Sequence, residues 1–386
     1  MPRPMLKSAA WERLDGQLRI VYDLREQFVV DDPDGSVEAL LILLRDGGRT
    51  VEELADALGV PAADLTGAID LLDAHGLVET DELHRLDPEV RERHASNLAF
   101  FESFASLARG SVELCRRVWD AHVLVLGTGG LNSNVLPHLA GLGVGRLTLL
   151  DCDVVERRNF ARQYLYAHRD LGARKVERAA EWVRRFDPRI EVTTVDHRID
   201  GPGFVADLLA EHRPDVVASG ADSPDAVDSW VNEACVPAGV PFVRAGMWVT
   251  QGIVWSVSPG QSACLGCRPA APMADPVARS ADPTAGDGVA SLDEERATLR
   301  LHASRPRTNR GIGPVAGLLG SLAAFEVLRY LSRFEPPAYA GRPLKIDFAA
   351  GCAMRQSTWT RDPRCAVCAG LDRERVFVRR EEVTVI

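Results

Sequence analysis

The sequence predicts an α/β protein built on a mostly parallel sheet, with a smaller domain before it. An apolar run, Val123–Leu126, is followed at once by a glycine-rich turn and a helical segment. A second apolar run, Arg146–Leu150, leads directly into Asp151, the arrangement of a mononucleotide-binding βαβ unit. Residues 1–90 instead show short strands followed by two helices with helix-start signals. These patterns predict a Rossmann-like sheet preceded by a small winged-helix-like α+β domain.

Length and composition limit the classes of protein to which the chain can belong. A chain of 386 residues exceeds one average domain. Its formal charge of −10 argues against a general nucleic-acid binder. No apolar run approaches the ~20 residues of a membrane helix, and the N-terminus has no apolar signal core. We therefore expect a cytoplasmic protein of two or three parts that binds neither nucleic acid nor a membrane.

The first predicted domain covers residues 1–90. Thr50 and Glu53 form a capping box that begins one helix, and Pro61 begins the next. Residues 64–76 of that second helix contain three aspartates and no Lys or Arg, so the helix would repel DNA phosphates. The other runs predicted as elements are Leu18–Asp23, Gln27–Val30, Val37–Leu44 and Leu77–Glu79.

Strands before a winged helix resemble the PqqD-like recognition element of enzymes that modify ribosomally made peptides. The resemblance implies that residues 15–85 bind the leader of a precursor peptide, which adds to an exposed sheet edge as an extra strand. The alternative is a purely structural N-terminal cap.

Residues 91–120 are predicted as a helical connector, and residues 121–386 as the main domain. Glycines at Gly127, Gly129 and Gly130 allow backbone N–H groups to approach a phosphate. The third glycine of the usual fingerprint is replaced by Asn132, so an ordinary strand–helix turn remains the alternative on the glycines alone. Further helices are predicted over 133–142, 176–186, 204–210, 228–238 and 311–331, and strands over 190–195, 215–218, 241–245, 252–258 and 344–348.

The segment after Asp151 resembles the nucleotide-binding core of the ThiF/MoeB/HesA family, the adenylating enzymes of ubiquitin-activating type. In that family the pattern LLDxDxVxxxNxxRQ is followed by Gly-x-x-Lys, and Asn159, Arg162, Gln163 and Lys175 match it in order and spacing. The resemblance covers roughly residues 90–370. It implies ATP and Mg²⁺ as cofactors, formation of an acyl-adenylate with release of pyrophosphate, and a homodimer.

The resemblance also implies a role for each matching residue. The three glycines would approach the phosphates, Asp151 would hold the ribose, and Asn159 and Arg162 would contact phosphates. Lys175 would neutralise charge as pyrophosphate leaves. Asp222, after the strand predicted at 215–218, would bind the magnesium carried by ATP. The catalytic set is therefore Arg162, Lys175 and Asp222, with exposed surface charges as the alternative reading of any one of them.

One family motif is altered. Where the family has RYxRQ, Arg93 keeps the first arginine and Ser96 replaces the second, which in the family reaches the ATP of the neighbouring subunit. Either another cation such as Arg310 takes its place, or adenylation is impaired.

Two Cys-x-x-Cys pairs, Cys264 with Cys267 and Cys365 with Cys368, predict a tetrahedral four-thiolate site for structural Zn²⁺. Disulfides or free thiols are the alternative. The wide separation of the two pairs is the arrangement found in the ThiF/MoeB family. The metal would join the segment after residue 260 to the C-terminal tail. Residues 269–308 look like the family's crossover loop. No cysteine lies between Cys267 and Cys352, which disfavours a covalent thioester relay.

The sequence therefore predicts ATP-dependent adenylation of a carboxylate, or an amide, of a ribosomally made precursor peptide, with a partner modifying enzyme as a further expected contact. Two alternatives remain open. One is adenylation of the C-terminus of a sulfur-carrier protein. The other is a catalytically degenerate protein that only presents a leader peptide to a partner enzyme; Ser96 and Asn132 favour this, and Lys175, Arg162 and Asp222 oppose it.

Overall fold

A computed structural model describes residues 3–23, 26–267 and 309–371. Its contacts divide the chain into two compact units. Unit 1 comprises Met1–Asp120 with Ser332–Phe334, and unit 2 comprises Ala121–Leu331 with Glu335–Ile386. The segment predicted as a helical connector falls in unit 1 and is helical there. The predicted crossover loop, 269–308, lies outside the described residues.

Unit 1 contains two small antiparallel sheets with the orders β2-β3-β4 and β1-β5. The capping box at Thr50 is confirmed: its hydroxyl accepts from the Glu53 backbone N–H at 3.3 Å, and the Glu53 carboxylate accepts from the Thr50 N–H at 2.8 Å. The strands are β1 Pro4–Leu6, β2 Ala10–Leu14, β3 Gln17–Asp23, β4 Glu26–Asp31 and β5 Val78–Thr80; the helices are α1 Ser36–Asp46, α2 Val51–Leu58, α3 Ala62–Ala74, α4 Pro88–Arg93, α5 Ala95–Glu102 and α6 Ser111–Trp119.

The strands predicted at Leu18–Asp23 and Gln27–Val30 and the three helices of residues 36–74 are confirmed, but β1 and β2 were missed. Strand β1 is three residues long and pairs with β5, more than seventy positions away in the sequence. Strand β2 is mostly exposed, so it lacks the alternation of apolar and polar residues that marks a half-buried strand.

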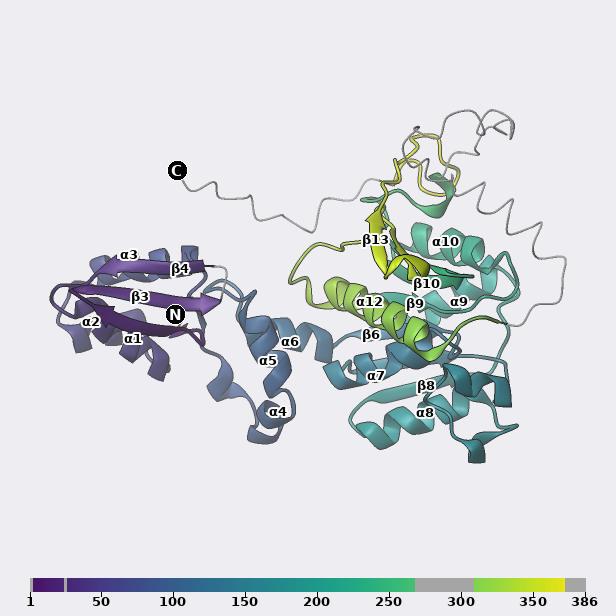
Figure 1. The fold of residues 1–386 in the computed structure, drawn as a ribbon, viewed down its shortest axis with the longest axis horizontal. Coiled ribbons are helices and arrows are strands. Elements are labelled where there is room, and N and C mark those ends of the chain that lie inside the picture. The colour runs from purple at the N-terminus through teal and green to yellow at the C-terminus, as the bar shows by residue number, and fades with distance from the viewer. Residues whose placement is uncertain (1–2, 24–25, 268–308, 372–386) are drawn as a thin grey trace. The chain divides into compact units, whose positions relative to one another are not determined.

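Unit 2 is organised around an eight-stranded sheet with the order β13-β12-β11-β10-β9-β6-β7-β8 (Figure 1). Strands β10, β9, β6, β7 and β8 run parallel, and β11, β12 and β13 extend the sheet in antiparallel fashion. The strands are β6 His122–Leu126, β7 Arg146–Leu150, β8 Glu191–Val195, β9 Val216–Ser219, β10 Phe242–Trp248, β11 Gln251–Val257, β12 Leu344–Asp347 and β13 Ala353–Gln356; the helices are α7 Asn132–Leu142, α8 Lys175–Phe186, α9 Pro202–His212, α10 Val227–Ala238 and α12 Gly313–Ser332.

The strand order reverses at β6, which pairs with β7 on one side and with β9 on the other. Right-handed crossovers place α7 and α8, which pack together, on one face of the sheet, and α9 and α10 on the other. The backbone N–H of Gly127 donates to Leu150 O at 2.7 Å, and that of Gly220 donates to Leu126 O at 2.8 Å. The loops that leave β6 and β9 therefore diverge at a topological switch point, where open α/β sheets bind ligands.

Helix α12 packs against β11 through a buried glutamate. The Glu326 carboxylate accepts from Ser256 Oγ at 2.7 Å and from the Ala338 and Tyr339 N–H groups at 2.9 and 2.8 Å. Among the described helices, α12 alone is long and apolar enough to cross a membrane, although no such run was expected from the sequence. However, 61% of its most apolar window is buried within the structure, as in the core helix of a soluble protein.

Candidate functional site

The glycine loop after β6 is shaped by close contacts that exclude side chains. Gly127 has a φ of +80°, and a Cβ there would lie 3.1 Å from the Ala221 backbone N. A Cβ on Gly130 would lie 2.8 Å from Arg162 Nε, because the arginine side chain passes over this glycine. The loop therefore needs glycine both for its backbone conformation and for its packing.

Asn132 has a structural reason to replace the third glycine. Its side-chain amide is buried and donates to Leu126 O at 3.1 Å, to Gly127 O at 2.8 Å and to Ala218 O at 3.1 Å. It thus ties the end of β6 to the end of β9. Gly220 provides the space for the Asn132 side chain, since a Cβ on residue 220 would lie 2.6 Å from Asn132 Nδ2. The departure from the fingerprint is a cross-strand brace at the switch point.

Asp151 braces the same loop. Its Oδ2 accepts from the Thr128 N–H at 2.7 Å and from Thr128 Oγ1 at 2.9 Å, and its Oδ1 accepts from the Asp153 N–H at 2.8 Å. On the other side of the threonine, the Tyr166 hydroxyl donates to Thr128 O at 2.8 Å. Burial raises the pKa of the Tyr166 phenol, so it stays a neutral donor. Neither Thr128 nor Tyr166 belongs to the fingerprint, so the sequence alone gave no sign of this brace.

Lys175 forms an ion pair with Asp153, which lies two residues after Asp151. The Lys175 ammonium lies 2.8 Å from Asp153 Oδ2, and the Lys175 N–H donates to Asp153 O at 3.0 Å. The lysine side chain is 7% exposed and the aspartate side chain is 66% exposed. A well-hydrated partner of this kind contributes little to stability. The pair therefore holds the cation at the site while leaving it available to another anion.

The predicted nucleotide residues converge on one cavity of about 970 Å³. Asn159 is buried at its wall, where its Oδ1 accepts from the Glu156 N–H at 2.8 Å and caps a short 3₁₀ turn. Asp222 follows the end of β9, is exposed and also lines the cavity. The cavity is lined by the glycine loop together with Asp151, Asn159, Arg162, Lys175 and Asp222.

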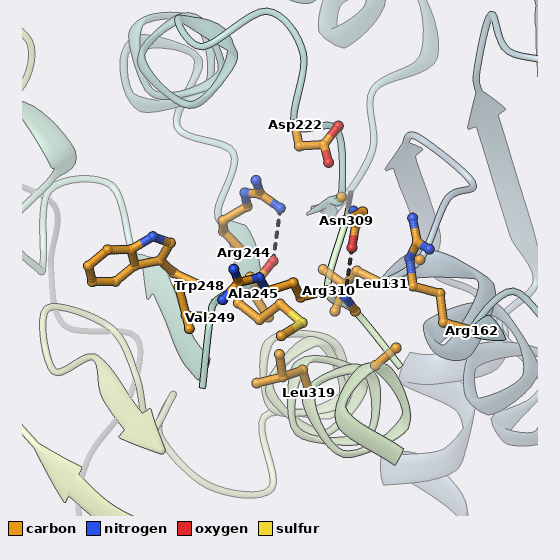
Figure 2. Close-up of a pocket in the computed structure, with 16 residues that line it drawn as sticks. Leu131, Arg162, Asp222, Arg244, Ala245, Trp248, Val249, Asn309, Arg310 and Leu319 are labelled. Carbon is orange, nitrogen blue, oxygen red and sulfur yellow. Dashed lines mark hydrogen bonds between the residues drawn. The ribbon is translucent and has the colours of Figure 1, made fainter. Parts of the chain in front are cut away.

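A second cavity of about 310 Å³ adjoins the first (Figure 2). Both are lined by Arg162, Asp222 and Gly220, so they meet beside these residues. Burial lowers the pKa of the Arg162 guanidinium while the nearby Asp222 carboxylate raises it. Arg310, the replacement cation expected from the sequence, lines the second cavity. The sequence did not reveal this cavity, because its walls come from segments far apart in the chain.

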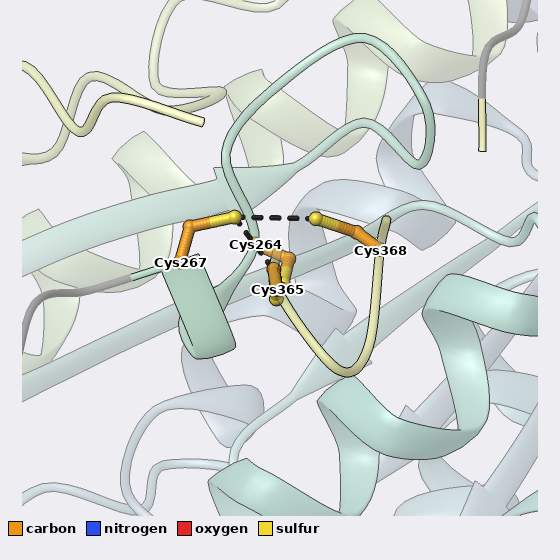
Figure 3. Close-up of side chains that lie close together, drawn as sticks. All are labelled: Cys264, Cys267, Cys365 and Cys368. Atoms are coloured by element: carbon orange, nitrogen blue, oxygen red, sulfur yellow. Dashed lines mark hydrogen bonds between the residues drawn. The ribbon is translucent and has the colours of Figure 1, made fainter. Parts of the chain in front are cut away.

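The four cysteines of the two Cys-x-x-Cys pairs form one buried cluster (Figure 3). Cys264 Sγ lies 3.8 Å from Cys267 Sγ and 3.6 Å from Cys365 Sγ, and Cys267 Sγ lies 3.2 Å from Cys368 Sγ. None of the four forms a disulfide, so the disulfide alternative is wrong for them. Tetrahedral zinc–thiolate bonds of about 2.3 Å place sulfurs roughly 3.8 Å apart, which fits this cluster.

A polar side chain beside the cysteines supports a metal at the cluster. Asn232 is buried, donates to Cys264 Sγ at 3.8 Å and accepts from the Leu265 N–H at 2.9 Å. Such a polar partner orients a ligating sulfur. Burial raises the pKa of the Cys264 thiol, so a thiolate there requires a cation.

The fold and the site together define a nucleotide-binding α/β domain of the adenylating type, and the chain belongs to the ThiF family, whose model matches residues 102–367. It is 34% identical over 253 residues to the adenylyltransferase and sulfurtransferase MOCS3 of Sus scrofa, which covers 65% of this chain and 49% of that protein. It is 32% identical over 251 residues to the molybdopterin-synthase adenylyltransferase of Escherichia coli K12, and the match covers 64% of this chain and 87% of that protein. This chain thus spans about half the length of the MOCS3 relative.

Solved structures share the fold over nearly the whole chain. Escherichia coli MccB matches with a TM-score of 0.72 at 19% identity, covering 98% of this chain and 99% of MccB. PaaA matches with a TM-score of 0.66 at 16% identity, covering 91% of this chain and 98% of PaaA. MccB is described as a microcin C7 biosynthetic enzyme and has been solved with ATP and with N-formylated MccA. The predicted α/β fold class is confirmed.

Proposed function

We propose that this protein is an ATP-dependent adenylyltransferase that activates a carboxylate of a ribosomally made precursor peptide. The observation that supports this most directly is the convergence of Lys175, Arg162 and Asp222 on one cavity at the switch point, beside a glycine loop. Two cations and a carboxylate at such a place suit a nucleoside triphosphate with its magnesium. The names of the relatives, which include three adenylyltransferases, agree with it.

In the proposed reaction, a carboxylate oxygen of the substrate attacks the α-phosphorus of ATP. A bond forms between this oxygen and the α-phosphorus. The bond from the α-phosphorus to the oxygen that bridges it to the β-phosphorus breaks, and pyrophosphate leaves with the electron pair of that bond. Lys175 exchanges Asp153 for phosphate oxygens, and Arg162 stabilises the charge that develops at the α-phosphate. Asp151 holds the glycine loop and accepts from the ribose. Asp222 would hold Mg²⁺, which offsets charge on the leaving pyrophosphate.

The cysteine cluster is proposed to hold a structural Zn²⁺. Its four sulfurs are buried, and four protein ligands leave no open position for a substrate. Among the described cysteines only Cys152 lines either cavity, and burial raises the pKa of the Cys152 thiol. The structure of the described residues thus agrees with activation that proceeds without a thioester.

Unit 1 is proposed to bind the leader of the precursor. Within the described residues, β2 and β4 each pair on one side only, so both present an open sheet edge. An extended peptide can add to such an edge through backbone hydrogen bonds. MccB, a microcin biosynthetic enzyme, shares the fold over 98% of this chain, which favours a peptide substrate. We further propose a cytoplasmic homodimer whose product passes to a partner modifying enzyme.

The test is ATP–pyrophosphate exchange by the purified protein with candidate precursor peptides from neighbouring genes. Peptide-dependent exchange is expected, and it should disappear in Lys175→Ala. Lys345→Ala, on β12 and outside both cavities, is the matched control. Leader binding without exchange would reject the adenylation proposal and support the presenter alternative.

A second candidate is adenylation of a sulfur-carrier protein, and one observation favours it. The Escherichia coli K12 sulfur carrier protein ThiS adenylyltransferase is 28% identical over 256 residues, which covers 66% of this chain and 88% of the relative. Exchange with a carrier protein ending in Gly-Gly, but not with any precursor peptide, would establish this candidate instead.

A further inference from the structure

The second cavity has two chemically different ends. One end, which it shares with the nucleotide cavity, is formed by Arg162 and Asp222, and Arg310 also lines the cavity. Figure 2 shows Trp248 and Val249 on the side away from Arg162. The end of β10 and the residue after it supply Met247, Trp248 and Val249, and α12 supplies Ala316 and Leu319. These five residues form an apolar wall, and the Arg310 side chain reaches toward Trp248 and Val249 at its edge (Figure 2).

Arg244 also lines this cavity, but its guanidinium is already hydrogen-bonded within the protein. Its Nε donates to Asp228 Oδ1 at 2.8 Å, and its NH1 donates to Ala245 O at 2.8 Å. Of the three arginines that line this cavity, only Arg162 also lines the nucleotide cavity, so it is placed to attract a substrate carboxylate there. A substrate that places its carboxylate beside Arg162 must lay the rest of its reacting residue along the apolar wall.

The hairpin that forms this wall is held in a costly conformation. Trp248 pairs with Gln251, and the turn between them places Val249 at a φ of +55°. A β-branched residue is a clear outlier in this left-handed region. The Phe348 N–H donates to Thr250 O at 2.8 Å, which fixes the turn from the neighbouring strand. Strain that persists in this way is typical of functional sites, and here it keeps an apolar side chain at the cavity.

From this arrangement we infer that the substrate's reacting residue is a C-terminal residue with a bulky apolar side chain, which occupies the pocket formed by Met247, Trp248, Val249, Ala316 and Leu319. This inference rests on the proposed function and makes its substrate class more specific. A chain that ends in glycine would leave the pocket empty and would gain nothing from its apolar surface. The pocket thus selects a leucine-like or methionine-like C-terminus over glycine.

The test uses stable acyl-adenylate mimics, in which an N-acyl sulfamate replaces the acyl phosphate of the adenylate. Calorimetry compares adenosine mimics that carry N-acetyl-leucine, N-acetyl-asparagine and N-acetyl-glycine, with adenosine 5′-sulfamate as the unacylated reference. We expect the leucyl mimic to bind at least about tenfold more tightly than the other two acyl mimics. The free energy gained by burying a leucine side chain corresponds to a change in affinity of at least this size.

The possible results separate the two proposals. Equal affinities for the leucyl and glycyl mimics would overturn the pocket assignment and leave adenylation intact. Tighter binding of the asparaginyl mimic would also overturn it, by showing a polar pocket. No binding of any mimic, with no binding of ATP, would reject the proposed function itself.

Substitutions in the pocket sharpen the result. Ala316→Leu fills the pocket from α12 and should abolish the preference for the leucyl mimic while binding of adenosine 5′-sulfamate stays the same. Val315→Leu, the neighbouring residue outside both cavities, is the matched control and should keep the preference. If Ala316→Leu fails to fold, Met247→Ala provides the test. It should weaken binding of the leucyl mimic severalfold and leave the affinity for the glycyl mimic unchanged. An unchanged preference in either folded variant contradicts the inference.

Discussion

The nucleotide cavity and the cysteine cluster lie in the same unit but are built in opposite ways. Most residues of the cavity come from one continuous stretch, 127–175, and its charged groups face a large open volume. The cluster joins cysteines that are 101 positions apart, and all four are buried. The cavity therefore concentrates charge for a ligand, whereas the cluster connects distant parts of the chain.

The difference indicates where stability and chemistry reside. Asp222 is exposed and Lys175 pairs with a hydrated carboxylate, so neither contributes much to folding. The cluster belongs to a hydrophobic core that includes β6, β9, α9 and α10. Substitutions in the cavity should therefore abolish activity without unfolding the protein, and substitutions in the cluster should do the reverse.

The largest effect is expected from Asp222→Ala. It removes the carboxylate proposed to hold magnesium, so peptide-dependent pyrophosphate exchange should fall by about 10²-fold or more. The thermal midpoint should stay within about 2 °C of the wild type, because the side chain is exposed. Asp225→Ala, an exposed neighbour outside both cavities, is the control and should exchange normally. A large loss of stability in Asp222→Ala would remove the contrast between the two regions.

Cys264→Ser should act mainly on stability. Loss of one of four ligands should reduce bound zinc from one per chain to a small fraction and lower the thermal midpoint by more than about 5 °C. Metal content is measured by atomic emission and the midpoint by calorimetry. Cys352→Ser changes an exposed cysteine outside the cluster and should leave both unchanged. Wild-type protein that purifies without zinc, at full stability, would contradict the assignment.

Asn132→Gly restores the usual fingerprint and tests whether the asparagine marks a degenerate site. It removes an amide that donates to three backbone oxygens, so the free energy of unfolding should fall by about 2–3 kcal/mol. Exchange should not rise. Asn132→Asp, which keeps the size but replaces the donor by an acceptor, should be at least as unstable in denaturant titration. Faster exchange at full stability would show that the glycine is the better residue here.

Ser96→Arg should have the smallest effect. Ser96 is exposed on α5, so the substitution should leave the thermal midpoint unchanged. Exchange should rise less than about tenfold, because Arg162 and Arg310 already line the cavities. Ser96→Ala serves as the control for loss of the hydroxyl. An increase of 10²-fold would show instead that the missing family arginine limits adenylation.

The sequence was sufficient for the parallel half of the sheet. Strand Arg146–Leu150 was predicted to the residue, and α7, α8 and α10 began within one residue of the prediction. These elements are long or fully buried, so their periodicity and flanking glycines identify them. The same local information identified the glycine loop and Asp151, because a glycine loop and the acid at the next strand end are close in sequence. Asn159, Arg162, Lys175 and Asp222 were identified through the resemblance to the ThiF/MoeB/HesA family.

Tertiary structure decided the features that depend on distant partners. The pairing of Lys175 with Asp153, the three acceptors of Asn132 and the brace from Tyr166 to Thr128 were not visible in the pattern. Strands β1 and β13 exist because they pair with β5 and β12, not because of their own composition. The apolar pocket is formed where β10 meets α12, some seventy positions later in the chain. By itself the sequence determined the fold class and the loop chemistry, since both depend on residues at short spacing, and it identified the four cysteines as two Cys-x-x-Cys pairs. The shape of the substrate pocket was decided by the folded chain, because only packing brings its walls together.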